Sequence, residues 1–330
     1  MNKQSISVVI PNYNGRILLQ EIIPPLIDAL QYTRHAYEII VVDDCSNDDS
    51  VHFLSNQYPL IKVLQNNANK GFAPTMNKGI FAAQHNYLFM LNTDVKLNED
   101  YFMHLFRYFE RGDTFGVMGR ITAWDNDNIE DGGKYPSFHG AKIKTSGNYV
   151  PIESAAENWL YSMYLSGANS LVSREKVLEL QGFDEIFAPF YVEDFELSLR
   201  AWRLGWRCYY EDKSICRHRV SSTIKSKNSK RFIETIYNRN KMFLHALHLS
   251  GLSLFRWYLQ TFFEVLFQCL LGRLWYAKAF IDFIANKKKI KSSKNIFEQL
   301  CRKHKKNIST KEVTATIIRA LQKKQIKIFK

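Results

Sequence analysis

Short apolar, β-prone runs alternate with helix-like segments along the first 95 residues. The runs occupy residues 6–10, 38–42, 61–64 and 87–95. Helices are expected from residue 17 to about 32, with a restart at Pro24-Pro25, then over 51–57 and 72–83. Strands and helices that alternate at such short intervals are typical of right-handed βαβ units over a parallel sheet. We therefore predict a doubly wound α/β fold with a mostly parallel central sheet for this half.

The run at residues 87–91 is apolar throughout and ends in Asn92-Thr93-Asp94. Such a run is typical of a strand buried on both faces of a parallel sheet. Two earlier strands also end in polar groups, at residues 11–14 and at Asp43-Asp44. The carboxyl ends of parallel strands share one edge, where open α/β folds bind ligands, so we predict a single crevice there. Alternatively, Asp94 caps the next turn or helix.

The net charge of +13 is concentrated at one end of the chain. Residues 286–330 hold 15 Lys/Arg against 2 Asp/Glu, so residues 1–285 are neutral. The basic segment indicates contact with an anionic surface, although a merely solvated tail would have the same composition. Residues 1–285 carry no net charge, which argues against a catalytic core that binds nucleic acid along its length. The tail also lacks the interleaved aromatic residues of stacking platforms, so we expect no nucleic-acid partner.

The cysteines and the hydropathy of the chain indicate the cellular compartment of the protein. Five scattered cysteines without metal-type spacing indicate ordinary thiols in a reducing compartment. The first residues lack the apolar core of a signal peptide. No window reaches the ~18 uncharged apolar residues of a spanning helix. We therefore expect a cytoplasmic protein that is peripheral on the inner face of the cell membrane.

Residues 226–285 have the pattern of amphipathic helices, with a bend at Gly272-Arg273. A helix that is apolar over most of its girth either packs on the preceding domain or lies in a membrane interface. The run Lys287-Lys288-Lys289 favours the membrane, because basic residues gain ~1 kcal/mol each near anionic lipid. Residues 309–329 are predicted to form one further basic helix. On a helical wheel, one polar stripe of this segment consists of Arg256, Gln260, Glu264, Gln268, Lys278 and Asp282.

A set of motifs gives the chain a specific likeness to a known family. The motifs lie at residues 7–14 (SVVIPNYN), 38–48, 69–72 with 77–79, 91–94, 166–168, 182–185 and 191–197. In these motifs the sequence resembles the inverting family-2 glycosyltransferases of the GT-A fold, over roughly residues 5–225. It looks closest to the rhamnosyltransferase-like branch that builds bacterial surface polysaccharides.

The resemblance implies a division of the chain into three parts. A GT-A catalytic domain would span residues 1–225, with a nucleotide-binding half to about residue 95 and an acceptor half over 96–225. Amphipathic, membrane-associated helices would follow over 226–285, and a basic tail over 286–330.

The resemblance also implies a UDP- or dTDP-sugar donor and places its binding site. Tyr13 would offer a stacking face, and a carboxylate at Asp43 or Asp44 would accept from the base. Lys70-Gly71, at the start of a helix, would add positive charge near phosphate, although this signal is weak. The implied nucleotide-sugar contacts are Pro11, Asn12, Tyr13, Asp43, Asp44, Lys70, Gly71, Asn92, Thr93 and Asp94.

Asp94 matches the second Asp of the family's Asp-x-Asp metal motif, whose first position here is Asn92. This departure removes one charge. One carboxylate and two diphosphate oxygens can still hold Mg²⁺ or Mn²⁺, which prefer oxygen ligands. His218 matches a family position that supplies a further ligand, although a lone His is more often a packed or surface residue.

The pair Glu193-Asp194 is the strongest catalytic candidate. It opens a predicted helix, whose dipole favours the ionised form that a base needs, although acids in first turns are also common stabilisers. The family match implies that Asp194 is the general base and Glu193 an acceptor or orientation contact. Glu196 and Arg200 are expected to pair on a solvated side of this helix. The implied acceptor-side residues are Gly167, Ala168, Asp184 and Glu185.

The resemblance thus implies single-displacement transfer of a sugar to an acceptor hydroxyl with inversion. A lipid-linked saccharide acceptor in capsule or O-antigen synthesis would account for the C-terminal helices. One alternative is a sugar-phosphate nucleotidylyltransferase, which would need a Gly-rich, Arg/Lys-bearing loop that residues 11–15 do not supply. The other alternative is a non-catalytic glycan- or lipid-binding scaffold, against which the intact Asp94 and Asp194 argue.

Overall fold

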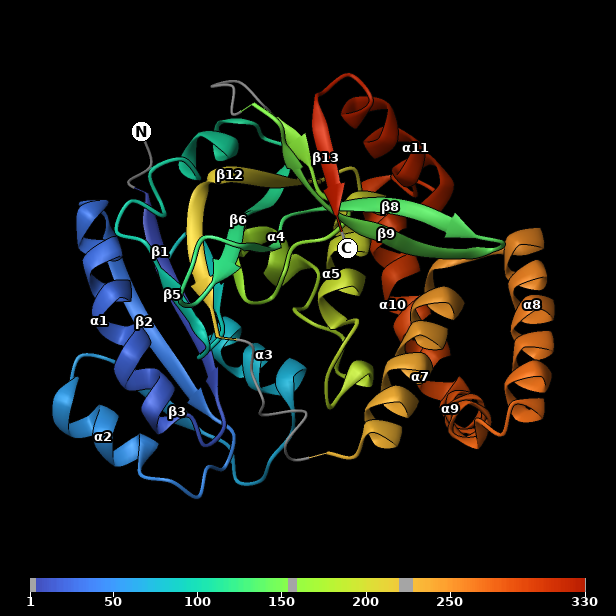
Figure 1. The fold of residues 1–330 in the computed structure, drawn as a ribbon, viewed down its shortest axis with the longest axis horizontal. Helices are drawn as coiled ribbons and strands as arrows, with labels where there is room; N and C mark the ends of the chain where they lie inside the picture. The colour runs from blue at the N-terminus through green and yellow to red at the C-terminus, as the bar shows by residue number, and fades with distance from the viewer. Residues whose placement is uncertain (1–3, 154–158, 220–227, 330) are drawn as a thin grey trace.

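A ten-stranded sheet runs through the centre of the fold in a computed structural model that describes residues 4–153, 159–219 and 228–329 (Figure 1). The strand order is β10-β12-β6-β11-β4-β1-β2-β3, with β5 on β12 and β7 on β6. The strands are β1 Ser5–Asn12, β2 Ala36–Asp43, β3 Lys62–Gln65, β4 Tyr87–Leu91, β5 Val95–Leu97, β6 Thr114–Ala123, β7 Ile129–Asp131, β10 Leu160–Tyr161, β11 Asn169–Ser173 and β12 Arg207–His218.

Side chains alternate between two cores on the two faces of this sheet. In β1, Ile6, Val8 and Ile10 join the core under α1 and α2, whereas Val9 joins the core under α3. This alternation follows from the two-residue period of a strand, and both faces are apolar because helices cover both. The helices are α1 Arg16–Tyr32, α2 Ser50–Gln57, α3 Phe72–Ala82, α4 Arg174–Glu179 and α5 Glu193–Arg203, with short 3₁₀ turns at η1 Phe106–Glu110 and η2 Glu185–Phe187.

The predicted alternation of strands and helices is confirmed, with two local differences. Helix α1 runs without a restart through Pro24 and Pro25. The predicted strand over residues 87–95 is two strands, because a turn closed by the bond from Val95 N to Asn92 O (3.3 Å) separates β4 from β5. β5 leaves β4 to pair with β12, where Leu97 lies opposite Cys216.

In the described residues, the rest of the fold consists of a second, three-stranded sheet and the helices α7 to α11 (Figure 1). The predicted bend at residue 272 is confirmed between α8 and α9. The predicted helix over 309–329 is instead α11 followed by β13, which extends the small sheet by pairing with β9. The elements are β8 Gly133–His139, β9 Lys142–Pro151, β13 Ile326–Phe329, α7 Lys230–His248, α8 Gly251–Leu270, α9 Leu274–Ala285, α10 Lys287–His304 and α11 Thr310–Leu321.

The basic segment after residue 286 is folded against the rest of the protein. Ile290 and Phe297 of α10 and Ile317 of α11 are buried, whereas most of the lysines of these helices are exposed. α8 is different, because Trp257 and Thr261 are its buried residues and a row of aromatic and aliphatic side chains faces outward. Within the described residues, no helix is both long and apolar enough to cross a bilayer.

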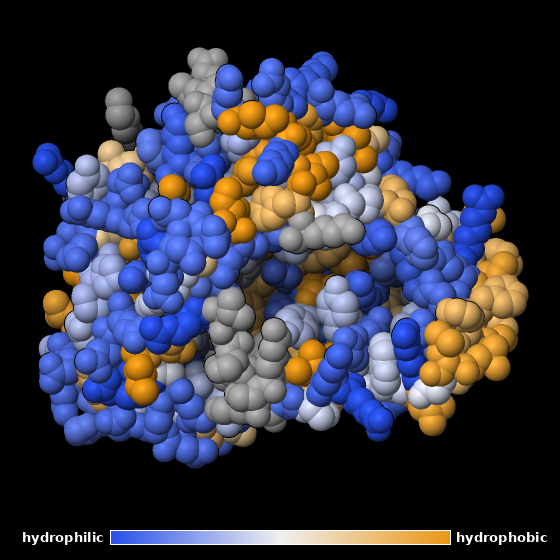
Figure 2. All heavy atoms as spheres, in the orientation of Figure 1, coloured by the Kyte–Doolittle hydropathy of each residue, from blue (hydrophilic) through white to orange (hydrophobic). Residues whose placement is uncertain are grey.

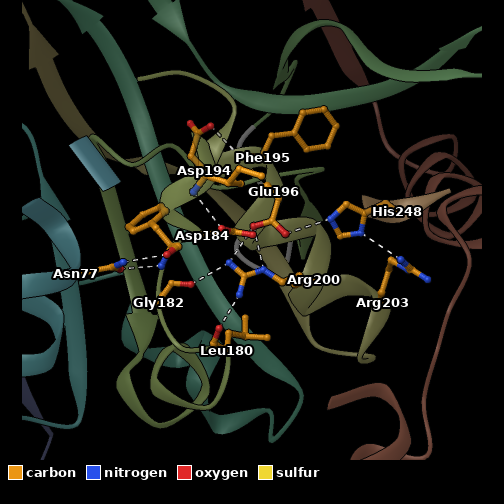
Figure 3. A network of polar contacts seen from close by, with 12 residues as sticks. Asn77, Leu180, Gly182, Asp184, Asp194, Phe195, Glu196, Arg200, Arg203 and His248 are labelled. Atoms are coloured by element: carbon orange, nitrogen blue, oxygen red, sulfur yellow. Dashed lines mark hydrogen bonds and ion pairs between the residues drawn. The ribbon is translucent and has the colours of Figure 1, made fainter. Parts of the chain in front are cut away.

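A buried polar network ties α5 to α7 (Figure 3). The prediction that Glu196 and Arg200 pair on a solvated side is wrong, because the two side chains are only 2% and 8% exposed. Arg200 Nη2 lies 2.8 Å from Glu196 Oε2, and His248 Nε2 lies 3.2 Å from Glu196 Oε1. Burial lowers the pKa of His248 to about 4, so the imidazole is neutral at pH 7. α7 covers the face of α5 that the sequence pattern left open to solvent.

Replacement of Arg200 should therefore be costly. Arg200→Met leaves the Glu196 carboxylate buried without its cation, which costs about 3–5 kcal/mol of unfolding free energy. Lys278→Met is the matched control, because Lys278 pairs with Asp282 at the same i,i+4 spacing but is 68% exposed. The control should lose ~0.5 kcal/mol or less. Urea unfolding measures both, and equal small losses would contradict a structural role for the Arg200 network.

Candidate active site

The ends of β1 and β2 form a hydrogen-bonded floor at one edge of the sheet. Asn12 lies opposite Asp43 in the parallel register, and its Nδ2 donates to Asp43 Oδ1 over 2.8 Å. Asp43 Oδ2 accepts from Ser46 N over 2.9 Å. Pro11 and Tyr13, on either side of Asn12, are partly exposed. The strand end thus leaves the Tyr13 side chain partly exposed and holds the Asp43 carboxylate in place.

Asp44 shapes the turn that carries Lys70 and Gly71. Its carboxylate accepts from Lys70 N and Gly71 N, both over 2.9 Å, so these two amides are directed at Asp44. The Lys70 side chain is exposed and supplies the positive charge of this turn. Gly71 has a φ of 85°, and a side chain there would overlap the backbone of Pro189. The turn therefore packs directly on the loop that precedes α5.

The predicted metal ligands lie together. Asp94 Oδ2 is 3.6 Å from His218 Nε2, although 124 residues separate them, because β12 pairs with β5 directly after Asp94. His218 Nδ1 is 3.0 Å from Glu130 Oε2, a contact that the sequence analysis missed. Burial lowers the pKa of His218, but the carboxylates of Asp94 and Glu130 outweigh it and raise the pKa to about 9.

The chemistry of this group fits a divalent cation. Asp94 Oδ1 and Asn92 Oδ1 are buried and have no hydrogen-bond partner in the described part of the chain. Buried polar atoms are normally satisfied, so these oxygens suit a ligand that accepts their lone pairs. Residues 4–153, 159–219 and 228–329 contain no group of three or more His, Cys, Asp or Glu that could hold a metal ion. A cation here would therefore need oxygens from its substrate.

Glu193 and Asp194 open α5, as predicted, after a strained segment. Tyr191 and Val192 have φ angles of 75° and 76°. A positive φ is rare for a β-branched residue and costs ~1–3 kcal/mol, so the surroundings must impose it. This geometry turns the chain sharply and brings the two acids to the sheet edge.

Asn240 of α7 holds this strained segment, and the sequence analysis missed it. The side chain is fully buried, and its Nδ2 lies within 3.0 Å of the carbonyl oxygens of Phe187, Phe190 and Tyr191. Asn is unfavourable inside a helix, but Asn240 lies in the polar run of residues 238–241, so the local pattern did not mark it. A helix from the C-terminal third thus positions the two acids.

The surroundings of Glu193 and Asp194 affect the pKa values of the two carboxyl groups differently. Burial and the neighbouring Asp194 charge raise the pKa of Glu193 to about 8. Burial also raises the pKa of Asp194, but backbone N–H groups of Phe195 and Gly167 and the Lys134 charge oppose that rise. Phe195 N donates to Asp194 Oδ1 over 2.7 Å. At neutral pH, Glu193 therefore keeps a proton, whereas the Phe195 N–H group stabilises the charged form of Asp194.

Short links connect the Asp94 loop to Asp194. Asn92 N donates to Ala168 O over 3.2 Å. A side chain at the adjacent Gly167 would touch Phe72 and Asp194. Thr93, within the same turn, is partly exposed. The Asp94 loop and the start of α5 therefore lie close together at one edge of the sheet. Figure 2 shows a hollow in the middle of one face of the molecule.

Asp184 and Glu185 lie in a separate polar environment. Asp184 Oδ1 accepts from Ile186 N over 3.1 Å, and Glu185 Oε1 accepts from Asn77 Nδ2 over 3.0 Å. Both acids line a cavity of about 290 Å³ together with Arg200 and His248. In Figure 3 the Asp194 carboxylate points away from this network. The acceptor-side role of Asp184 and Glu185 stays a prediction.

Comparison with known proteins establishes the family. The Glycosyl transferase family 2 model matches residues 7–177, just over half of the chain, so the chain belongs to this family. The Bacillus subtilis putative teichuronic acid biosynthesis glycosyltransferase TuaG is 33% identical over 101 residues, which are 30% of this chain and 39% of the relative. The Pyrococcus furiosus dolichol-phosphate mannosyltransferase is 30% identical over 118 residues, which are 35% of this chain and 33% of the relative.

A solved structure confirms the fold. The crystal structure of GalNAc-T7 with UDP, GalNAc and Mn²⁺ superposes with a TM-score of 0.64 at 16% identity, over 98% of this chain and 58% of that one. The predicted GT-A fold and family-2 membership are thus confirmed. Because the alignments span only a third to two fifths of these curated relatives, they do not carry the relatives' activities to this chain.

The raised pKa of Glu193 predicts a pH-dependent stability. The unfolded carboxyl ionises near its ordinary value of 4.5, whereas the folded one keeps its proton to about 8. Stability should therefore fall as pH rises through this window, because the unfolded state binds fewer protons there. Glu193→Gln removes the loss, so its stability relative to wild type should rise between pH 4.5 and 8.

Thermal unfolding across this pH range measures the difference. Glu99→Gln, which removes an exposed carboxylate, controls for the loss of one negative charge. A wild type–variant difference that is the same at both ends of the range would show that Glu193 is not held protonated.

Proposed function

We propose that this protein is an inverting glycosyltransferase that moves a sugar from a UDP- or dTDP-sugar to an acceptor sugar hydroxyl in bacterial surface-polysaccharide synthesis. The observation that carries the proposal is the placement of Asp94 with His218 and of Glu193 with Asp194 at one edge of a family-2 fold. A rhamnosyltransferase-like activity is the form that the sequence motifs favour.

Asp194 serves as the general base. Its side chain is partly exposed, and its raised pKa makes the ionised carboxylate a stronger base than an ordinary aspartate. It takes the proton of the acceptor hydroxyl as that oxygen attacks the anomeric carbon opposite the leaving nucleoside diphosphate. Glu193, which holds a proton, can donate a hydrogen bond to the acceptor. Two acids with different environments thus take different roles.

The nucleotide-sugar would lie along the strand ends. Tyr13 would stack on the base beside Pro11, and the Lys70 ammonium would face phosphate. Asp94 and His218 would hold Mg²⁺ or Mn²⁺, which when bound neutralises charge on the departing diphosphate. The relative solved with UDP and Mn²⁺ supports a nucleotide-sugar and a divalent metal as ligands of this fold.

The acceptor would be a lipid-linked saccharide at a membrane surface. The support is the outward row of apolar side chains on α8, which forms an orange patch at the edge of the molecule in Figure 2. We define the α8 apolar face as Leu252, Phe255, Leu259, Phe262, Phe263, Leu266, Phe267 and Leu270, which are 47–86% exposed. A patch of this kind marks an interaction site, and the exposed lysines of α10 favour an anionic membrane.

Loss of the proposed base should stop transfer without loss of donor binding. Asp194→Asn should lower turnover by about 10²–10⁴-fold, while stabilisation by the nucleotide-sugar and Mn²⁺ stays nearly unchanged. Asp94→Asn should lose the Mn²⁺-dependent part of that stabilisation. Transfer assays and thermal shifts with a panel of UDP- and dTDP-sugars, with and without Mn²⁺, measure both effects.

Asp100→Asn is the control, because it removes an exposed carboxylate and should leave both readouts at wild-type values. Retained turnover in Asp194→Asn would remove Asp194 from the base role. If Asp94→Asn keeps the Mn²⁺-dependent stabilisation, the metal does not bind at Asp94.

The α8 apolar face should bind lipid. Phe263→Gln with Phe267→Gln, at positions that are 59% and 58% exposed, should lower partition onto vesicles at least about tenfold, because each buried Phe contributes ~1.5–3 kcal/mol. Vesicle flotation measures the partition. Substitutions are preferable to removal of residues 286–330, because α10 and α11 are packed into the fold.

Tyr32→Gln with Leu60→Gln is the matched control, since these side chains are 49% and 97% exposed on other elements. The control should float like wild type. Equal partition by all three proteins would show that α8 does not contact lipid.

A further inference from the structure

A cavity of about 730 Å³ opens between the turn of the β8–β9 hairpin, the first half of α8 and the start of α11. We propose that this cavity binds the phosphate-bearing headgroup of an anionic membrane lipid. The proposal rests on the membrane attachment proposed above and gives that attachment a specific lipid site. The lining residues are Phe138, Gly140, Ala141, Leu249, Ser253, Arg256, Gln260, Thr310 and Lys311.

The charge of the cavity is of one sign. Arg256 and Lys311 line it, and no Asp or Glu is among the lining residues. Both side chains are exposed, and in the described part of the chain neither makes an ion pair or hydrogen bond. Ser309 and Glu312 cap the start of α11, so the two cations supply the charge and the helix end does not. An Arg and a Lys facing one space are suited to phosphate oxygens.

Hydrogen bonds fix one wall of the cavity. Gln260 Oε1 accepts from Ala141 N over 2.8 Å, and its Nε2 donates to His139 O over 3.1 Å. Gly140 has a φ of 61°, and any side chain there would overlap the Gln260 amide. Lys142 pairs with Glu264 one turn further along α8. The hairpin turn is thus attached to α8, and the cavity exists before any ligand arrives.

The cavity borders the α8 apolar face. One stripe of α8 lines the cavity and consists of Ser253, Arg256 and Gln260. The residues directly before these three, Leu252, Phe255 and Leu259, belong to the α8 apolar face and are 62%, 64% and 49% exposed. Adjacent residues of a helix lie about 100° apart around its axis. A headgroup in the cavity would therefore have its acyl chains beside the apolar face. This match of charge and apolar surface identifies the occupant as an anionic phospholipid.

The test compares two pairs of charge removals in the full chain. One variant is Arg256→Gln with Lys311→Gln, and the matched control is Lys288→Gln with Lys289→Gln, which removes two exposed charges of α10. Flotation is measured on phosphatidylcholine vesicles with and without phosphatidylglycerol. The cavity variant should bind the anionic vesicles at least about tenfold more weakly than the control variant, because it loses charge-assisted hydrogen bonds as well as long-range attraction.

The outcomes separate this inference from the proposals on which it rests. If both variants lose binding equally while wild type floats, the cavity is not a site, and membrane attachment stands. If the wild-type protein binds neither vesicle type, the proposed membrane attachment and the proposed lipid site both fail. The proposed transferase activity does not depend on this result, because Asp194→Asn tests it separately. If inorganic phosphate stabilises wild type but not the cavity variant, and both float equally, the cavity binds a free anion and the lipid proposal is overturned.

Discussion

The parallel pairing of β4, β1 and β2 is the constraint on which the rest of the structure depends. Because the three strands run side by side in the same direction, their carboxyl ends must share one edge. Apolar residues on both faces fix the register, since a shift by one residue would exchange the two cores. The placement of Asp43 and Asp94 therefore follows from hydrophobic packing well away from any ligand.

The second half of the site is positioned by different means. Glu193 and Asp194 do not follow a parallel strand, so the sheet alone cannot place them. Instead, a strained turn directs them, and the buried side chain of Asn240 in α7 compensates for the strain with hydrogen bonds. The C-terminal third of the chain thus completes the site that the N-terminal half begins. The part matched by the family model, residues 7–177, contains neither Asp194 nor the side chain that holds its loop.

Local pattern was sufficient for the strands, the first helices and the strand-end acids, because each depends on nearby residues. It failed wherever a distant segment decides the outcome. The run at 87–95 divides because β12 competes for Val95. Glu196 and Arg200 are buried because α7 covers them. The secondary structure of residues 310–329, a helix followed by a strand, depends on pairing with the edge of β9, which the sequence pattern did not reveal. The likeness to a family indicated which acids to examine, whereas Glu130 and Asn240 became visible only through their contacts.

The pairing of β13 with β9 has a consequence for synthesis on the ribosome. β9 emerges long before its partner, since about half of the chain separates Lys142–Pro151 from Ile326–Phe329. Helix α8, with its exposed apolar face, is translated in that interval, while the small sheet still lacks its third strand. A growing chain thus exposes the α8 apolar face before it is fully folded, because domains generally fold as units during translation. The small sheet of such a chain is complete only after β13 has emerged.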